Sequence, residues 1–193
     1  LSKNSNIKLL IPEVKESGYG IVPTSSTTAQ LAIGDALAIS LMYQKKFNKM
    51  DFKKFHPSGN LGKKLRTVED LMLKNRRIPF VEENSSLSSA IKIINNKKLG
   101  VAIIRNKKGE TTGIFTDGDI KRTIQKKSNI KNLMIKSFMT RNPISVDKDI
   151  LAAKAVSIMN EKKITSLCVY KKSNQKKTVG ILHIHSLIDA NIF

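Results

Sequence analysis

The sequence contains no tryptophan, a single cysteine and few aromatic residues, and each shortage narrows the kind of protein it can be. With aromatic residues at only 5%, the chain offers no evident stacking platform for bases or sugars. The single cysteine, Cys168, rules out an internal disulfide, which fits a reducing compartment. Because Cys168 lies in a strand-like run, we expect a small buried residue there rather than a reactive thiol.

Long apolar runs are also missing. The longest apolar stretch, residues 31–43, is interrupted by Asp35 and is too short to span a bilayer. The first residues carry no signal-peptide pattern, so we expect a cytoplasmic protein without a membrane partner. The chain begins at Leu1 rather than Met, and residues 1–22 contain one strand-like run without a visible partner strand. We therefore expect a fragment of a longer protein.

Acidic residues are scarce, with 15 acidic against 35 basic side chains, which leaves a net charge of +20. Such a charge suggests a nucleic-acid partner. However, most of the cations are lysines, whereas arginine is the residue suited to bidentate contacts with phosphates and bases. The lysines occur as doublets at loop-like sites along the chain. We therefore expect a solvated basic surface with weak, salt-sensitive binding to polyanions and no specific nucleic-acid partner.

Residues 1–64 contain a short strand-like run, one long helix and a histidine joint. The strand is predicted at residues 7–11, and Pro12 ends it. A helix is predicted at residues 28–46 after several possible N-caps. Its apolar side chains lie nearly all round, so we expect it to be buried in something larger. At residues 55–64, Pro and Gly beside His56 predict a turned rather than helical backbone.

The remainder of the chain repeats one order of elements with a spacing of roughly 65 residues. Each copy has a helical lead-in, an extended run, a helix, a strand, a polar turn, a second strand and a closing helix. Leaving out the polar turn, the expected ranges in the first copy are 68–72, 78–81, 86–96, 100–104, 112–115 and 117–125. Those in the second copy are 135–139, 143–146, 151–160, 166–170, 179–182 and 185–190. Repetition on this scale predicts two units that bury a shared face against each other.

The first copy carries the run GIFTDGDIKR at residues 113–122. With it, the two copies resemble a tandem pair of CBS domains, a ligand-sensing module. In CBS domains that bind adenosine nucleotides, a hydroxyl residue after the strand and an aspartate three positions later hold phosphate and ribose. The resemblance implies these roles for Thr116 and Asp119. The alternative is that Thr116 only caps the closing helix while Asp119 favours its first turn.

The second copy departs from this pattern. His183 and Ser186 stand where the hydroxyl residue and the aspartate would be, so this half-site should not hold ribose in the usual way. His183 and His185 would share one face if the strand continued through both. Two histidines alone are a weak metal signal, and we expect no metal site. We interpret the pair as a surface or inter-repeat feature.

The whole chain resembles the C-terminal portion of the D-arabinose 5-phosphate isomerases. The resemblance rests on the runs VPTSSTT at 22–28, GDALA at 34–38, HPSG at 56–59 with Leu61-Gly62, and residues 113–122. It implies an α/β fold with an incomplete sugar isomerase (SIS) segment at 1–64 and CBS domains at 65–128 and 129–193. It further implies aldose–ketose isomerisation of D-ribulose 5-phosphate to D-arabinose 5-phosphate, for the Kdo sugar of lipopolysaccharide.

The resemblance also implies site residues. His56 matches the family's catalytic histidine, although Ser58 replaces the first glycine of the family motif. Glu16 matches a catalytic glutamate, with Glu13 as the alternative because the spacing is one residue short. Four hydroxyl residues would line the sugar site: Thr24, Ser25, Ser26 and Thr27. The side chain type of His56 is the only one in residues 1–64 whose unperturbed pKa lies near neutrality, so it could pass a proton during ring opening. The plainer alternatives are helix capping by His56 and by the hydroxyl residues.

The family's other catalytic residues and its phosphate loop precede the part matched here, so we expect the chain to be inactive alone. The implied partners are a sugar phosphate substrate, an adenosine or other nucleotide at the CBS pair, and further copies of the chain in a tetramer. No cofactor is expected. The alternative function is a stand-alone CBS pair that senses a nucleotide, which would need neither His56 nor the hydroxyl-rich helix start.

Overall fold

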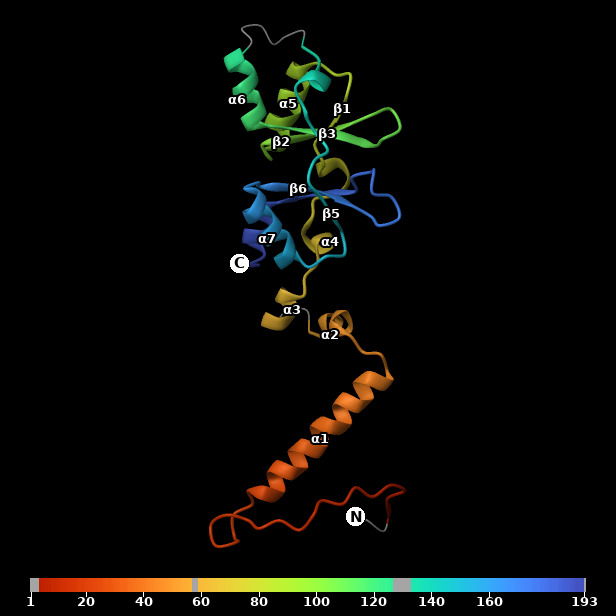
Figure 1. Ribbon diagram of the computed structural model, residues 1–193, viewed down its shortest axis with the longest axis vertical. Coiled ribbons are helices and arrows are strands. Elements are labelled where there is room, and N and C mark those ends of the chain that lie inside the picture. Colours follow the sequence, from red (N-terminus) through yellow and green to blue (C-terminus); the bar gives the residue numbers. More distant parts are fainter. Residues whose placement is uncertain (1–3, 57–58, 127–132, 193) are drawn as a thin grey trace. The chain divides into compact units, whose positions relative to one another are not determined.

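The computed structural model describes residues 4–56, 59–126 and 133–192 (Figure 1). The chain divides into two units, of which the first ends at Phe52 and the second begins at Lys53. Helices and strands alternate along the second unit, which confirms the predicted α/β class. None of the helices in the described part of the chain is long and apolar enough to cross a membrane.

The first unit contains an irregular segment, a tight turn and one long helix, α1 (Ser25–Gln44). Gly18 and Gly20 take positive φ angles in the turn, and the Val22 N–H donates to the Ser17 carbonyl across it. The strand predicted at residues 7–11 is not formed, so that expectation is wrong. A strand needs a neighbour for its backbone groups, and no strand accompanies these residues in the described part of the unit.

Helix α1 begins at Ser25, three residues before the start expected from the sequence. The difference arises because the Glu16 carboxylate accepts the N–H groups of Ser25 and Ser26, which the first helical turn leaves without partners. Within the described chain the helix buries no residue, and Leu31 and Tyr43 are 68% and 81% exposed. The expected burial is therefore not found inside this unit. Apolar side chains on all sides are typical of a helix that packs within a larger domain.

The second unit contains two repeats of one order of elements, as the sequence predicted. Helix α2 (Lys49–Phe55) spans the boundary between the units, and α3 (Asn60–Lys64) follows it. The first repeat consists of α4 (Val68–Leu71), a 3-10 turn (Asn75–Arg77), β1 (Phe80–Glu82), α5 (Leu87–Lys97), β2 (Val101–Arg105), β3 (Thr111–Thr116) and α6 (Asp117–Lys126). The second repeat consists of a 3-10 turn (Ile135–Ser137), β4 (Thr140–Arg141), β5 (Ser145–Asp147), α7 (Ala152–Lys162), β6 (Ser166–Tyr170), β7 (Gly180–His183) and α8 (Ile184–Asp189).

Helix α3 corrects the prediction for the histidine joint. Residues 60–64 are helical, and the Lys63 N–H donates to the Gly59 carbonyl at 2.9 Å where this helix starts. A proline restricts its own φ angle and the residue before it, but it does not prevent a helix a few residues later. Pro57 and Ser58 themselves lie outside the described residues.

The two repeats form two sheets with matching registers. In the first sheet the strand order is β1-β2-β3-β4, with β1 parallel to β2 and the other pairs antiparallel. In the second sheet the order is β5-β6-β7, with β5 parallel to β6 and β7 antiparallel to β6. The pairing of Phe80 with Ile103 in one sheet corresponds to the pairing of Ser145 with Cys168 in the other.

The sheets face each other, with helices on their outer sides (Figure 1). Alternate residues of β2 therefore serve two cores: Ala102 and Ile104 pack towards the helices of their own repeat, whereas Ile103 packs against the other repeat. Cys168 lies in the shared cluster from the opposite sheet. Its expected burial is confirmed, and desolvation raises the pKa of its thiol to about 12, so it stays protonated at neutral pH.

The lead-in of each repeat crosses to the other repeat, an exchange that the sequence did not predict. Val68, at the start of the first repeat, is fully buried in the core of the second repeat beside Leu182. Ile135, at the start of the second repeat, is fully buried in the core of the first beside Phe115. Backbone pairing follows the same exchange, because β4 joins β3 and the Leu73 N–H donates to the Ile181 carbonyl at 2.9 Å.

Glycine is required where each crossing segment passes over a strand. A Cβ atom at Gly113 would lie 2.6 Å from Met139 Sδ and 2.9 Å from the Thr140 carbonyl oxygen. A Cβ atom at Gly180 would lie 3.2 Å from the Leu73 carbonyl oxygen and closer still to Met72 Sδ. The methionines can move, but the backbone oxygens are fixed by the crossing itself.

We therefore expect Gly113→Ala to lower the free energy of unfolding by about 1–3 kcal/mol, the range usual for overpacking. Gly180→Ala should lower the free energy of unfolding by less, because the new Cβ would lie farther from the nearest backbone oxygen than at Gly113. Urea unfolding of the chain measures both effects. The matched control is Gly118→Ala, where the nearest atom would lie 3.5 Å from the new Cβ. A Gly113→Ala protein as stable as the control would contradict the crossing geometry.

Candidate functional site

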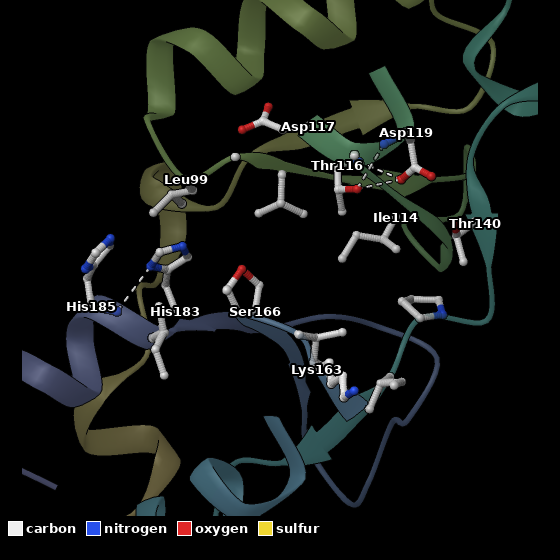
Figure 2. Close-up of a pocket in the computed structure, with 18 of the residues that line it drawn as sticks. Leu99, Ile114, Thr116, Asp117, Asp119, Thr140, Lys163, Ser166, His183 and His185 are labelled. Carbon is white, nitrogen blue, oxygen red and sulfur yellow. Dashed lines mark hydrogen bonds between the residues drawn. The ribbon is translucent and has the colours of Figure 1, made fainter. Parts of the chain in front are cut away.

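A cavity of about 680 Å³ lies between the two repeats of the second unit (Figure 2). Its volume falls in the range of pockets that hold small organic ligands. Both repeats line it, and so does the crossing segment that begins with β4, through Thr140 and residues 142–144. The exchange of lead-ins therefore builds one wall of this cavity.

Two cross-strand pairs face the cavity from opposite repeats. Val101 pairs with Thr116 between β2 and β3, and Ser166 pairs with His183 between β6 and β7. Between these pairs much of the lining is apolar, and its apolar side chains are Leu99, Val101, Ile114, Pro143, Ile144, Ile164 and Ile184. The cavity thus combines apolar walls with a hydroxyl group on each side, a composition suited to a flat molecule with polar edges.

Thr116 and Asp119 meet at the start of helix α6, as Figure 2 shows. Asp119 Oδ2 accepts hydrogen bonds from Thr116 N at 2.9 Å and from Thr116 Oγ1 at 2.8 Å. The Asp119 N–H donates back to Thr116 Oγ1 at 3.3 Å. This reciprocal arrangement confirms that the pair caps the helix. Both residues also line the cavity, so capping does not exclude a ligand at the same place.

Asp119 keeps some capacity to bind. It is only 7% exposed, and its other oxygen, Oδ1, accepts from Arg122 Nη2 at 2.6 Å. A carboxylate offers about four acceptor positions, and the bonds from Thr116 and Arg122 occupy three of them. Arg122 forms an ion pair with Asp119 and so offsets its negative charge. Lys98 and Lys163 also belong to the lining and add positive charge to it. Both lysines end helices, α5 and α7, in the left-handed conformation.

His183 caps helix α8 and is held as a neutral imidazole. Its Nδ1 accepts from the His185 N–H at 3.3 Å, and its ring also hydrogen-bonds the Leu99 backbone. Desolvation, followed by the charge of His185, lowers the pKa of His183 below its usual value. His183 is 7% exposed, so its interpretation as an inter-repeat feature is confirmed and the surface alternative is wrong.

His185 corrects the other part of that interpretation. Strand β7 ends at His183, and His185 lies in the first turn of α8, so the two histidines do not share a strand face. The strand ends there because the imidazole of His183 satisfies a backbone N–H of the helix start. Among the described residues, no group of three His, Cys, Asp or Glu side chains could hold a metal ion.

In the first unit, the structure brings Glu16 together with the hydroxyl-rich helix start. Glu16 Oε2 accepts from Thr24 N at 2.6 Å and from Ser25 N at 2.7 Å, while Oε1 accepts from Ser26 N at 3.1 Å. Thr27 Oγ1 donates to the Thr24 carbonyl at 2.8 Å. Of the two glutamates considered, Glu16 is therefore the one that organises this turn. The contacts are those of a helix cap, and a role in sugar binding stays a prediction.

His56 lies in the second unit, directly after the last residue of α2, and its side chain is exposed. Glu16 and the four hydroxyl residues belong to the first unit. Within the first unit the structure groups Glu16 with the hydroxyl residues at the start of α1, and within the second it groups Thr116 and Asp119 at the cavity between the repeats, whose lining does not include His56. Its proposed role in proton transfer stays a prediction.

Sequence reasoning missed Ser166 and the two lysines of the cavity. An alignment of the two repeat sequences would have placed Ser166 at the position equivalent to Val101. It would then have stood out as a polar residue in an otherwise apolar strand. Lys98 and Lys163 carried no such signal, because they sit in doublets like most other lysines of the chain.

The hydrogen bonds to Glu16 predict an unusual titration. Contacts from the Ser26 side chain and from the Thr24 backbone lower the pKa of Glu16 from 4.5 to about 2. Because the folded pKa lies below the unfolded one, this contribution to stability is complete above pH 4.5 and is lost as the pH falls through about 2. NMR titration of the side-chain carboxyl should give that low midpoint. A midpoint near the usual value would show that the cap does not form.

Comparison with known proteins identifies the repeats. A family model described as "CBS domain" matches residues 68–126 and again residues 135–192. Among solved structures, the chain resembles CBSX2 of Arabidopsis thaliana in complex with AMP, with a TM-score of 0.56 and 23% identity over 65% of this chain and 96% of that one. It also resembles the CBS domain protein PAE2072 of Pyrobaculum aerophilum complexed with AMP, with a TM-score of 0.56 and 18% identity over 63% and 90% of the two chains. At these identities the likeness establishes the fold alone.

The similarity to curated proteins extends over the whole chain. The arabinose 5-phosphate isomerase KdsD of Francisella tularensis is 40% identical over 190 residues, which are 97% of this chain and 57% of that protein. The KdsD of Escherichia coli K12 is 36% identical over 194 residues, covering 100% of this chain and 58% of that enzyme. The chain thus spans less than two thirds of the length of these relatives. With both repeats matched by the family model, the chain belongs to the CBS-domain family and carries a tandem pair of CBS domains.

Proposed function

We propose that the chain is the C-terminal part of an arabinose 5-phosphate isomerase, which interconverts D-ribulose 5-phosphate and D-arabinose 5-phosphate for lipopolysaccharide synthesis in the cytoplasm. The main support is the identity of 36–40% to such enzymes, which extends through residues 1–64 and not only through the CBS repeats. A stand-alone CBS module would have no use for this first segment.

Under this proposal the chain has three parts. Residues 1–64 complete an SIS domain, and residues 65–128 and 129–193 are the two CBS domains. The exposed apolar surface of α1 supports this division, because such a helix suits the interior of a larger domain. The proposal further holds that the chain alone is inactive, since it spans only 57–58% of these relatives. It also takes the complete enzyme to be a tetramer.

The reaction moves a proton between C1 and C2 of the sugar through an enediol, after the sugar ring has opened. It needs a base near these carbons, a group that assists ring opening, and a cradle for the phosphate. In the proposal His56 passes the ring-opening proton, because an imidazole can both accept and donate a proton. The carboxylate of Glu16 accepts backbone N–H groups of Thr24 and Ser25 and so holds the turn from Thr24 to Thr27, which would contact the sugar phosphate.

In the complete enzyme, His56→Ala should lower kcat by about 100-fold or more, the usual contribution of one acid–base group. The CBS pair should bind its ligand as before, because His56 does not line the cavity between the repeats. Steady-state kinetics and a ligand titration on the same preparation measure both effects. Unchanged turnover would remove His56 from the site, whereas a complete wild-type protein without isomerase activity would favour the alternative, a nucleotide-sensing CBS module.

We further infer that the CBS pair binds an adenosine nucleotide in the inter-repeat cavity and thereby regulates the enzyme. The support is the chemistry of the lining. The start of α6 offers backbone donors to a phosphate, Asp119 offers an acceptor to ribose hydroxyls, and the lysines add positive charge. Thr116 donates both of its hydrogens to Asp119 and so holds that carboxylate at the cavity. AMP in the two related CBS structures agrees with this ligand class.

The capping role of Asp119 must be separated from ligand binding, and the chain offers a matched control. Thr67 and Asp70 cap α4 with the same contacts, with distances of 2.6 and 2.9 Å to Asp70 Oδ2, and they lie outside the cavity. Asp70 is also paired with Lys53, as Asp119 is with Arg122.

Asp119→Asn and Asp70→Asn should each lower the free energy of unfolding by about 0.5–2 kcal/mol, because each weakens a helix cap. Only Asp119→Asn should weaken AMP binding, by about tenfold or more, as expected for a lost hydrogen bond to a charged group. Calorimetric titration of AMP into the chain measures the difference. Equal AMP affinity in the two variants would leave Asp119 with capping alone.

A further inference from the structure

One hydroxyl group at the cavity has no hydrogen-bond partner. The Oγ atom of Ser166 is buried, and no donor or acceptor among the described residues contacts it. A buried hydroxyl without a partner lowers the stability of the folded chain, so such groups are rare and call for an explanation. Figure 2 shows Ser166 on the side of the cavity opposite Thr116 and Asp119.

The fold does not require a serine at this place. Strand register makes Ser166 the counterpart of Val101, since each is the first residue of a central strand and each pairs with the last residue of the strand beside it. The first repeat fills this position with an apolar side chain that is 1% exposed. A valine or alanine would therefore satisfy the packing, and the hydroxyl of Ser166 serves something other than the fold.

The neighbouring histidine does not supply the missing partner. One ring nitrogen of His183 accepts from the backbone of the α8 start, and the ring also hydrogen-bonds the backbone of Leu99. Both of its polar positions are thus engaged within the protein. The ring occupies the place that Thr116 has in the first repeat, so the second repeat offers no equivalent hydroxyl at its helix start.

The two halves of the cavity therefore differ chemically. The first repeat presents the carboxylate of Asp119 at a helix start, whereas the second has no carboxylate among the described residues of the lining and presents an engaged imidazole and the unused hydroxyl of Ser166. A nucleotide has the same division, with ribose and phosphate at one end and an apolar ring with polar edges at the other.

We propose that Ser166 Oγ hydrogen-bonds the base of the nucleotide whose ribose and phosphate lie at Thr116 and Asp119, so that the cavity holds one nucleotide in a single orientation. Aliphatic residues of both repeats, such as Ile114 and Ile164, cover the faces of the base. This inference rests on the nucleotide-binding function proposed above.

The test replaces Ser166 by alanine in the 193-residue chain and titrates it with AMP and with ribose 5-phosphate. Ser166→Ala should weaken AMP binding by about three- to tenfold, the effect of one neutral hydrogen bond, and leave the affinity for ribose 5-phosphate unchanged. Wild-type chain should bind one AMP. The ligand-free variant should unfold about 2–4 °C higher than wild type, because an unsatisfied polar group has been removed.

Two further variants keep the test decisive. Ser157→Ala removes a hydroxyl that only bonds the Ala153 carbonyl on the exposed side of α7, and it should change neither affinity. Ser166→Thr keeps the hydroxyl and should retain AMP binding, so it tests the inference if the alanine variant fails to fold. Loss of AMP affinity in Ser166→Thr equal to that in Ser166→Ala would overturn it.

The outcomes separate this inference from the proposed function. If wild-type chain binds no AMP, the nucleotide-binding function fails and this inference fails with it. If wild type binds AMP and Ser166→Ala binds it equally well, the function stands and only the role of Ser166 is overturned. Equal weakening of AMP and ribose 5-phosphate would also overturn it, because the hydroxyl would then not contact the base.

Discussion

Each repeat of the CBS pair completes its core with a segment that belongs to the other. Val68 fills the second core and Ile135 fills the first, and both are fully buried. Burial of such side chains contributes about 1.5–3 kcal/mol each, a large share of the net stability of a small domain. Neither repeat can therefore reach its full stability alone, and the pair is the smallest unit that closes its apolar surface.

The same exchange creates the cavity. The segment that crosses to pair with β3 continues past Thr140 to Ile144, and both residues line the space between the sheets. The two sheets contact each other through a small shared cluster around Ile103 and Cys168, which fixes their separation. The cavity thus arises from the way the two repeats exchange segments. Its walls are fixed by the same strand pairing and apolar packing that hold the two cores together.

Local patterns predicted the elements of the fold but not their exchange. Helix α5 was predictable because its apolar side chains recur on one face and Ser86 precedes it as a cap. The cap formed by Thr116 and Asp119 was predictable from their spacing. In contrast, nothing in the spacing of Val68 says which core it enters, because that choice depends on contacts with residues much later in the chain, from Val146 to Leu187. The shared strand face considered for His183 and His185 fails for a related reason, because β7 ends at His183 and His185 lies in the first turn of α8.

The crossing segments also constrain how the chain acquires its structure during synthesis. The first repeat emerges from the ribosome before the second, yet its core waits for Ile135 and its sheet waits for β4. Until these residues appear, Phe115 and its neighbours lack their cover, and exposed apolar surface of this kind promotes aggregation. Gly113 then allows the later-synthesised backbone of Met139 and Thr140 to settle across β3, which precedes it in the chain. A nascent chain of this design depends on uninterrupted translation through both copies.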